Sequence, residues 1–275
     1  MNNRSAAYER RGVPVALEWY SYNEQSLTGE GIYCLRSKPK SPGFVAKTEW
    51  TRAEMAAGLQ YILAKEAGKP AGFIEYTPGE QAWRAVHADG YLVIHCLWTG
   101  LTGRGIGSAL IDCCVEDARR QGKHGVAAVT NADTSWAPGP EIFRKNGFIP
   151  VDEAPLGFQL YMYKLVDAPV PYFPRDWNDR LQRLGEGLTI LRSGQCPYIE
   201  VACANVLEAA AALDIPAEVV QLRTREALLQ LSPTPYGVFN VVYNGELIAY
   251  HRLTPRSFAK KLQSLKNGHP AHPLS

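Results

Sequence analysis

The stretch Gly90–Arg120 reads Tyr91-Leu-Val-Ile-His-Cys-Leu-Trp98, then Thr102-Gly-Arg-Gly-Ile-Gly107, then Ser108-Ala-Leu-Ile-Asp-Cys-Cys-Val-Glu-Asp-Ala-Arg-Arg120. An unbroken apolar run, a glycine-rich turn and an amphipathic segment predict a buried strand, a tight loop and a helix. The loop carries Arg104 and no acidic residue. Its glycines let backbone N–H groups converge at the start of a helix, where the helix dipole favours an anion. The stretch therefore predicts a phosphate-binding loop.

A dinucleotide-binding fold uses the same order of strand, loop and helix, but with a different spacing. It needs G-x-G-x-x-G and an acidic residue about 20 positions further on. Here Ser108 stands in place of the third glycine, and the next apolar segment, residues 126–132, contains Asn131 and no acidic residue. The spacing therefore disfavours a dinucleotide fold.

The loop instead resembles the coenzyme A loop of the GNAT acetyltransferases, whose pattern is Gln/Arg-x-x-Gly-x-Gly/Ala. The pattern falls on residues 102–107, with Thr102 in place of Gln or Arg. The family binds the pyrophosphate largely through loop N–H groups, so the resemblance implies acetyl-CoA as cofactor. It also implies pairing of the pantetheine arm with the backbone of Leu97 and Thr99. The implied pyrophosphate residues are Thr102, Gly103, Arg104, Gly105, Ile106, Gly107 and Ser108.

A second motif, Glu141-Ile-Phe-Arg-Lys-Asn-Gly-Phe148, resembles the later helix-to-strand signature of the same family. Gly147 is typical of the residue that follows a helix, and Phe148 would begin the next strand. The two motifs together imply a GNAT fold over residues 31–165.

Composition limits the classes of function. A chain of 275 residues predicts two domains or one large one. Its 29 basic and 27 acidic residues nearly balance, without a basic stripe, which disfavours nucleic acid as a partner. No apolar run is long enough to span a membrane, and the N-terminus lacks a signal-peptide core, so we expect a cytoplasmic protein. The six cysteines form neither a disulfide framework nor a zinc-type pair, and we expect no metal.

The first half is expected to begin with a loose arm over residues 1–30. Thr51-Arg-Ala-Glu54 has the spelling of a capping box and predicts a helix that runs to about Ala67. The helix at 108–120 follows the loop, and another ends at Gly147. The predicted strands are 31–35, 71–76, 81–86, 91–98, 125–130, 148–151 and 157–164.

Three prolines within residues 166–174 predict a stiff linker, which with a short helix at 176–184 fills residues 166–187. The predicted strands beyond it are 188–192, 217–222, 238–243 and 247–253, the last two joined by an Asn244-Gly245 turn. The predicted helices are 199–213, 225–231 and 255–265, and residues 266–275 are expected to be a disordered tail. This order is similar to the thioredoxin and glutaredoxin folds, in which a cis-proline, matched here by Pro235, faces the cysteine. The resemblance implies a smaller thioredoxin-like domain over residues 188–265.

The two halves together resemble the YoaP-type acetyltransferases. Similar phrases are Gly72-Phe-Ile-Glu-Tyr-Thr-Pro-Gly-Glu-Gln-Ala-Trp-Arg84, Gly90-Tyr-Leu-Val-Ile-His-Cys-Leu-Trp98 and Gln195-Cys-Pro-Tyr198. The resemblance spans nearly the whole chain and implies no particular acceptor.

Acyl transfer from a thioester needs a base for the acceptor and a proton for the leaving thiolate. In most GNAT enzymes a tyrosine in the late helix can supply that proton, but Phe143 occupies the matching position. Tyr91, Cys96, Ser135 or solvent would have to replace it.

Glu75 and His95 are the candidate bases, because each lies in an apolar strand where burial displaces a pKa. The competing interpretation is a solvent-facing carboxylate and a hydrogen-bonded core histidine. Trp83, Arg84 and Trp98 could shape an acceptor pocket or serve only in packing.

Cys196 precedes a predicted helix, whose N-terminus gives a thiol thiolate character. Cys203 would lie about 10 Å away along the helix, beyond the roughly 7 Å that disulfide geometry tolerates between Cα atoms. Cys196 is therefore a candidate catalytic or thiol-binding residue without an internal redox partner, or a structural remnant.

The sequence predicts an α/β protein with a GNAT fold and a smaller thioredoxin-like domain. The predicted activity is transfer of an acetyl group from acetyl-CoA to an amine of a small molecule that can also contain a thiol. A GNAT-fold lyase or decarboxylase, motivated by Phe143, and a non-catalytic module that binds coenzyme A or a thiol remain alternatives. A homodimer is allowed.

Overall fold

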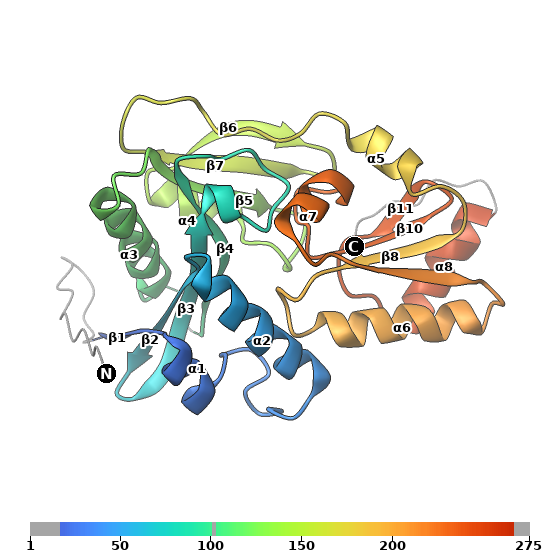
Figure 1. The fold of residues 1–275 in the computed structure, drawn as a ribbon, viewed down its shortest axis with the longest axis horizontal. Coiled ribbons are helices and arrows are strands. Elements are labelled where there is room, and N and C mark those ends of the chain that lie inside the picture. Colours follow the sequence, from blue (N-terminus) through green and yellow to red (C-terminus); the bar gives the residue numbers. More distant parts are fainter. Residues whose placement is uncertain (1–16, 101–102, 267–275) are drawn as a thin grey trace.

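The computed structural model describes residues 17–100 and 103–266, which form two sheets (Figure 1). The predicted tail beyond residue 266, the predicted arm before residue 17, and Thr102 lie outside the described residues. The larger sheet comes from the first part of the chain and the smaller sheet from the second. The α/β fold class is confirmed.

The larger sheet has seven strands, and all neighbouring pairs except β4–β5 are antiparallel. In spatial order the strands are β1 (Leu17–Ser21), β2 (Gln60–Glu66), β3 (Lys69–Pro78), β4 (Tyr91–Thr99), β5 (Gly125–Asn131), β7 (Phe158–Lys164) and β6 (Ile149–Ala154). The helices of this half are α1 (Glu24–Glu30), α2 (Pro42–Ala56), the 3₁₀ helix η1 (Gly79–Gln81), α3 (Ile106–Arg120) and α4 (Pro140–Lys145).

The parallel pair β4–β5 stops pairing before its strands end. Paired residues run from Tyr91 opposite Gly125 to Ile94 opposite Ala128. Beyond that point β4 continues for five residues and β5 for three, to the bounds given above. Since the strands no longer pair there, the backbone edges that they turn toward each other are left without a strand partner among the described residues.

A β-bulge falls on β4 where this separation begins. Glu75 of β3 lies opposite Cys96, whereas its neighbour Tyr76 lies opposite Ile94, so His95 is an extra residue on β4. A bulge bends a strand and redirects its side chains. The register shift therefore coincides with the separation of β4 from β5.

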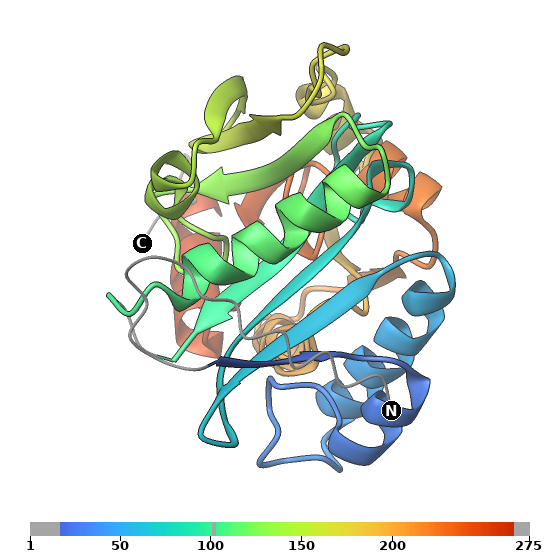
Figure 2. The same cartoon turned by 90° about the vertical axis from the view of Figure 1, so that its left-hand side faces the viewer.

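Side chains alternate between the two faces of the larger sheet. On one face Ile94 packs in a cluster with Leu110 of α3. On the other face Val93 shares a cluster with Trp50 of α2 and Ile190 of the smaller sheet. Figure 2 shows α3 lying across the near face of the sheet, with α6 (Ile199–Ala211) behind it. The second half of the chain therefore covers the face opposite α3.

The smaller sheet consists, in spatial order, of β11 (Glu246–Ala249), β10 (Phe239–Tyr243), β8 (Leu188–Arg192) and β9 (Ala217–Gln221). β8 and β9 are parallel, and the other pairs are antiparallel. The hairpin turn was predicted correctly: Asn244 and Gly245 both have positive φ, 51° and 75°. The helices, besides α6, are α5 (Trp177–Arg183), α7 (Arg225–Leu231) and α8 (Pro255–Lys266).

The elements predicted for the second half are confirmed in kind and order. One detail of the thioredoxin resemblance is wrong. The described residues contain no cis peptide bond, so the bond before Pro235 is trans.

Two predictions near the N-terminus are wrong. The expected arm is structured from residue 17 onward, because β1 pairs along its whole length with β2. The expected strand at 31–35 is a turn, and Ile32 is buried in the cluster that includes Phe44 and Tyr61. The apolar residues there fill the core from a turn instead of a strand.

The predicted helix at 51–67 is also wrong. α2 begins earlier, with Ser41 as its N-cap and Pro42 in its first turn, and the Thr51 hydroxyl donates to the Lys47 carbonyl inside it. The helix ends before Gly58, whose φ is 102°, and the chain returns as β2. The N-cap at Ser41, ten residues ahead of Thr51, thus determines where the helix starts.

The predicted strand at 81–86 is a buried loop instead. Ala82, Ala85 and Val86 are all buried, and the Ala85 N–H donates to the Pro235 carbonyl. Its main chain therefore bonds to the second half of the chain and not to a strand.

Candidate active site

The turn before α3 has the backbone geometry of an anion-binding loop. Gly103 and Gly105 have φ of 79° and 75°, in the left-handed region that glycine adopts at little cost. Gly105 is the N-cap of α3, no side chain caps the helix, and its first turn holds no acidic residue. The first-turn N–H groups, from Ile106 to Ser108, have no intrahelical acceptor. Such a helix end attracts a phosphate group.

Arg104 lies in this loop but already has a partner. Its Nη1 donates to Oε2 of Glu66 on β2 at 2.8 Å, and its Nη2 donates to Oε1 at 2.6 Å. The side chains are 35% and 25% exposed, so solvent reaches the pair. The structure therefore gives the predicted phosphate ligand a competing carboxylate, and its role toward a cofactor stays a prediction.

Leu97 and Thr99 lie on β4 beyond Ile94, the last residue that pairs with β5. Their strand is paired with β3 on one side only. This is the position that the predicted pantetheine contacts require, and those contacts remain a prediction.

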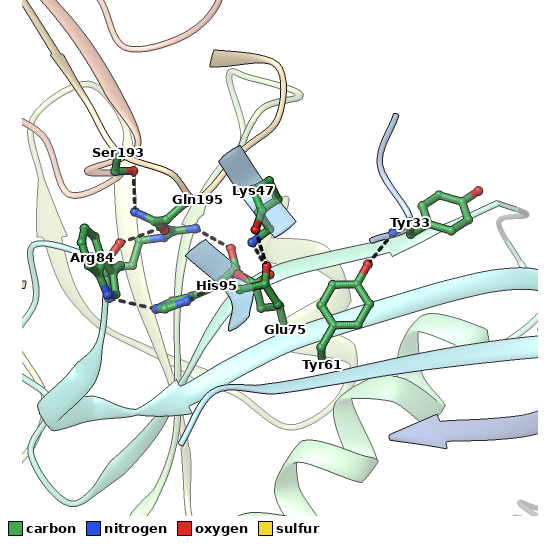
Figure 3. A network of polar contacts seen from close by, with 10 residues as sticks. Tyr33, Lys47, Tyr61, Glu75, Arg84, His95, Ser193 and Gln195 are labelled. Carbon is green, nitrogen blue, oxygen red and sulfur yellow. Dashed lines mark hydrogen bonds and ion pairs between the residues drawn. The ribbon is translucent and has the colours of Figure 1, made fainter. Parts of the chain in front are cut away.

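A buried cluster of polar side chains lies on the face of the sheet opposite α3 (Figure 3). Glu75 of β3 is 2% exposed. Nζ of Lys47 on α2 lies 2.5 Å from its Oε2, and Nδ1 of His95 lies 3.6 Å from its Oε1. The Lys47 ammonium also lies 4.1 Å from the ring centroid of Trp50. The structure thus brings the predicted Glu75 and His95 together and adds a lysine.

The hydrogen bonds fix the tautomer of His95. Its Nε2 accepts the backbone N–H of Trp83 at 2.9 Å, so Nε2 carries no proton. The proton of the neutral ring is therefore on Nδ1, which faces Glu75. In this arrangement His95 has no free lone pair, and it could act as a base only after losing the bond from Trp83.

The surroundings displace both pKa values. Burial raises the pKa of Glu75, but the Lys47 charge and the nearby His95 N–H outweigh burial, and the pKa falls to about 2. Burial lowers the pKa of His95 to about 4, against the opposing effect of Glu75. At neutral pH Glu75 is therefore a carboxylate and His95 a neutral imidazole.

Arg84 connects this cluster to the second half of the chain. Its guanidinium donates to the main-chain oxygens of Trp83, at 2.8 Å, and of His95. It also donates to the side-chain oxygen of Gln195, whose Nε2 donates to Ser193 Oγ at 3.1 Å (Figure 3). Arg84, a residue that the sequence had suggested for an acceptor pocket, therefore lies where the two halves of the chain meet.

Two glycines permit this close approach. A Cβ on Gly43 of α2 would lie 1.9 Å from the main-chain oxygen of Pro197, and a Cβ on Gly194 would lie 2.8 Å from the Cβ of Trp50. Real Cβ atoms do not approach so closely. The segment that contains Cys196 is therefore packed directly against α2.

Cys196 lies beside the cluster and is partly exposed. The charges of Lys47, Glu75 and Arg84 all act on its thiol, but burial is the largest effect and raises its pKa. Burial therefore opposes the thiolate character expected from the helix N-terminus, and its effect on the pKa favours the protonated thiol. All six cysteines are free.

The residue at the position of the family's usual proton donor is Phe143, as the sequence indicates. Phe143 is fully buried in the core and has no proton to give. Among its predicted substitutes, Tyr91 donates its hydroxyl to the Pro169 carbonyl at 3.0 Å, and Ser135 is exposed. Cys96 is partly exposed, and burial raises its pKa well above the ordinary value. The geometry does not single out one of them.

The two tryptophans named as pocket candidates differ in position. The ring of Trp83 packs edge-on against Trp50, with centroids 5.6 Å apart. Trp98 is 39% exposed, and its ring lies against Tyr33 at a tilt, with centroids 4.5 Å apart. Trp83 thus borders the buried cluster, whereas Trp98 lies on the surface.

Sequence reasoning missed Lys47, Gln195 and Tyr236 as members of this site. Lys47 was hidden because α2 was placed too late in the chain. Gln195 adjoins Cys196 in the Gln195–Tyr198 motif, but its partner is Arg84 of the other half of the chain, which the motif does not indicate. The ring centroid of Tyr236 lies 5.1 Å from the Arg84 guanidinium carbon, and no local pattern announces this contact.

Among the described residues, no group of three or more His, Cys, Asp or Glu side chains could hold a metal ion. Within the same part of the chain, none of the helices has the length and apolar character needed to cross a membrane.

Known acetyltransferases are similar to this chain in sequence. The sequence model of the acetyltransferase (GNAT) family matches residues 29–137. The uncharacterized N-acetyltransferase YoaP of Bacillus subtilis (strain 168) is 28% identical over 225 residues, which cover 80% of this chain and 87% of that protein.

Solved structures are similar over about half of the chain. A GNAT family acetyltransferase from Brucella melitensis in complex with acetyl-CoA is 20% identical, with a TM-score of 0.35, and the match covers 56% of this chain and 91% of that one. The PaiA N-acetyltransferase from Thermoplasma acidophilum in complex with coenzyme A is 15% identical, with a TM-score of 0.38, covering 54% and 99%.

Proposed function

We propose that the chain transfers an acetyl group from acetyl-CoA to an amine of a small molecule, because residues 29–137 match the sequence model of the acetyltransferase (GNAT) family. One observation carries the proposal. The uncapped N-terminus of α3 adjoins the open ends of β4 and β5, and a buried charged cluster lies on the opposite face of the same strands.

The cofactor side is proposed to use main-chain groups. The N–H groups of residues 103–108 would hold the pyrophosphate, with the Arg104 side chain beside them, whereas Thr102 of the predicted set lies outside the described residues. The pantetheine arm would enter between β4 and β5 and pair with the backbone of Leu97 and Thr99. Since β4 and β5 are not paired beyond Ile94 and Ala128, the arm could pass between them, and the thioester would arrive near Glu75 and His95.

The bound cofactor supplies the activated acetyl carbonyl and the thiolate leaving group. An amine that attacks this carbonyl must lose a proton, and Glu75 is the proposed acceptor of that proton. With Lys47 paired to it, its pKa of about 2 makes the carboxylate a weak base. We therefore propose that the acceptor's ammonium group displaces Lys47 from Glu75 when it binds.

His95 is proposed as a positioning residue, because its Nδ1–H faces Glu75 and its Nε2 holds Trp83. Cys196 is proposed to border the acceptor, where its thiol can contact a thiol-containing substrate. Its neighbours Gly194 and Pro197 pack against α2, which supports a place for the second half of the chain in the proposed active site.

The proposed domain division follows from the two sheets. Residues 31–165 would form the acyltransferase domain, 166–187 a linker with α5, and 188–265 a thioredoxin-like domain. The order β8-α6-β9-α7-β10-β11-α8 supports the last assignment.

Ligand-induced stabilisation tests the cofactor. Acetyl-CoA at 100 times its Kd should raise the free energy of unfolding by about 2.7 kcal/mol. Thiol release from acetyl-CoA across a panel of amines then tests turnover, with Glu75→Gln expected to abolish it while acetyl-CoA still binds. Absence of stabilisation by any acyl-CoA would overturn the proposal, and binding without turnover would favour a non-catalytic module.

A further inference from the structure

The starting observation is a buried arginine without a carboxylate. Arg84 and Arg180 are each 4% exposed, and they are the buried arginines of the described chain. Arg180 donates from Nε to Asp176 Oδ1 at 2.8 Å and from Nη1 to the Ser232 carbonyl at 3.0 Å. Within residues 17–100 and 103–266, no carboxylate forms an ion pair with Arg84. One buried cation is thus neutralised by the protein, and the other is not.

The partners of Arg84 are neutral. Two N–H groups of Nη1 go to the Trp83 carbonyl and the Gln195 side-chain oxygen, and one N–H of Nη2 goes to the His95 carbonyl. A guanidinium has five N–H donors. The donors left over are the N–H of Nε and one N–H of Nη2. The Nε atom is not enclosed in the way that the buried polar atoms without a partner in the described chain are, so solvent can reach it.

Nearby carboxylates are committed elsewhere. The charge of Glu75 reaches Arg84, but Glu75 is in contact with Lys47 and faces His95. Glu54 is half-buried, accepts a hydrogen bond from Trp83 and interacts with the Lys47–Glu75 pair. Neither carboxylate contacts the Arg84 guanidinium.

The guanidinium is held in place before any ligand arrives. Three carbonyl oxygens fix its plane, and the Tyr236 ring lies 5.1 Å from it. Two free N–H donors on a fixed guanidinium match the two oxygens of a carboxylate. Preorganised donors lose little entropy on binding. A structural role needs no spare donors, whereas recognition of an anion needs them.

We propose that Arg84 binds a carboxylate of the acceptor, so that the substrate class is an amine that carries a carboxylate, as an amino acid does. The inference rests on the proposed acetyl transfer and deepens it. The acceptor's ammonium group would meet Glu75, and its carboxylate would meet Arg84, on either side of His95. Each charge of the substrate would thus pair with an opposite charge of the site.

Binding of product-like probes tests this without turnover. The probes are N-acetyl amino acids with small, aliphatic, aromatic, charged and sulfur-containing side chains, each paired with its neutral amide. Binding to the full chain is measured by calorimetry in the presence of coenzyme A. We expect at least one acid to bind about tenfold to hundredfold more tightly than its amide, the range of a charge-assisted hydrogen bond. Equal or absent binding of acids and amides throughout the panel overturns the inference.

Two variants locate the effect. Arg84→Gln should remove the difference between acid and amide while the Kd for coenzyme A stays unchanged, because the loop at α3 lies on the other face. Gln195→Glu places a carboxylate of the chain against Arg84 and should remove the difference even if Arg84→Gln does not fold. Survival of the difference in either folded variant contradicts the role of Arg84. Failure of coenzyme A to bind wild-type protein would instead count against the proposed acetyl transfer.

Discussion

The loop at the N-terminus of α3 and the buried cluster around Glu75 lie on opposite faces of the same strands, but they are built differently. The loop consists of consecutive residues, with glycines of positive φ at 103 and 105, and it is proposed to act through main-chain groups. The cluster takes Lys47 from a helix, Glu75 and His95 from two strands, and Gln195 from the other half of the chain. A local backbone geometry can be read from a sequence, whereas a charge pair formed over long range cannot.

The largest expected effect is on the free energy of unfolding, which should depend much more on the buried cluster than on the loop. Lys47→Met leaves Glu75 as a buried charge without its partner, and we expect the free energy of unfolding to fall by about 3–5 kcal/mol. Urea unfolding followed by tryptophan fluorescence measures this. The double variant Lys47→Met, Glu75→Leu should recover most of the loss, because no charge is then left alone. A loss below about 1 kcal/mol, as for an exposed pair, would show that the cluster is solvated like the loop.

The cluster should also make stability depend on pH. Unfolded His95 takes up a proton near pH 6.5, its ordinary pKa, but folded His95 does so only near pH 4. Between these values the unfolded chain binds more protons, so stability falls as the pH is lowered, by about 3 kcal/mol in total. Folding lowers the pKa of Glu75 from 4.5 to about 2, so the stability continues to fall as the pH is lowered from 4.5 to about 2.

His95→Gln isolates the histidine contribution, because glutamine keeps an acceptor for Trp83 and does not titrate. Comparison of the two proteins is needed, since burial also lowers the pKa of His87 and His251. The free energy of unfolding, measured at several pH values from 7 to 4, should change less with pH in the variant than in the wild type. The same pH dependence for variant and wild type would mean that folding does not lower the pKa of His95.

The contact between the halves of the chain can be broken by one methyl group. Gly43→Ala would place a Cβ 1.9 Å from the Pro197 oxygen, and we expect a loss of about 1–3 kcal/mol from overpacking. Gly29→Ala on α1 is the matched control, because nothing lies within 4 Å of its Cβ. If Gly43→Ala is as stable as the control and keeps full turnover, then Cys196 and Gln195 are not needed beside α2.

The predictions from the sequence divide in the same way, into local patterns that are confirmed and long-range contacts that are missed. The glycine loop, α3, the helix stop at Gly147 and the turn at Asn244 are local patterns, and each was predicted. α2 was misplaced because Thr51 and Glu54 spell a cap, whereas Ser41 and Pro42 form the real one. The segment at 81–86 resembled a strand because it is apolar, but its backbone bonds to Pro235. Lys47 could not be assigned to Glu75 without knowing that α2 crosses β3.

The smallest expected effect concerns Arg104, and it tests whether the loop acts through its main chain. If the first-turn N–H groups carry the pyrophosphate, Arg104→Ala should change the Kd for acetyl-CoA by no more than about fivefold, since an exposed ion pair contributes roughly 0–1 kcal/mol. Gly105→Val, which places a β-branched residue at φ 75°, should weaken binding far more. Calorimetric titration of both variants gives the ratio. A loss with Arg104→Ala as large as with Gly105→Val would mean that Arg104 leaves Glu66 for the phosphate, so that the loop, like the cluster, acts through a charge already paired in the free protein.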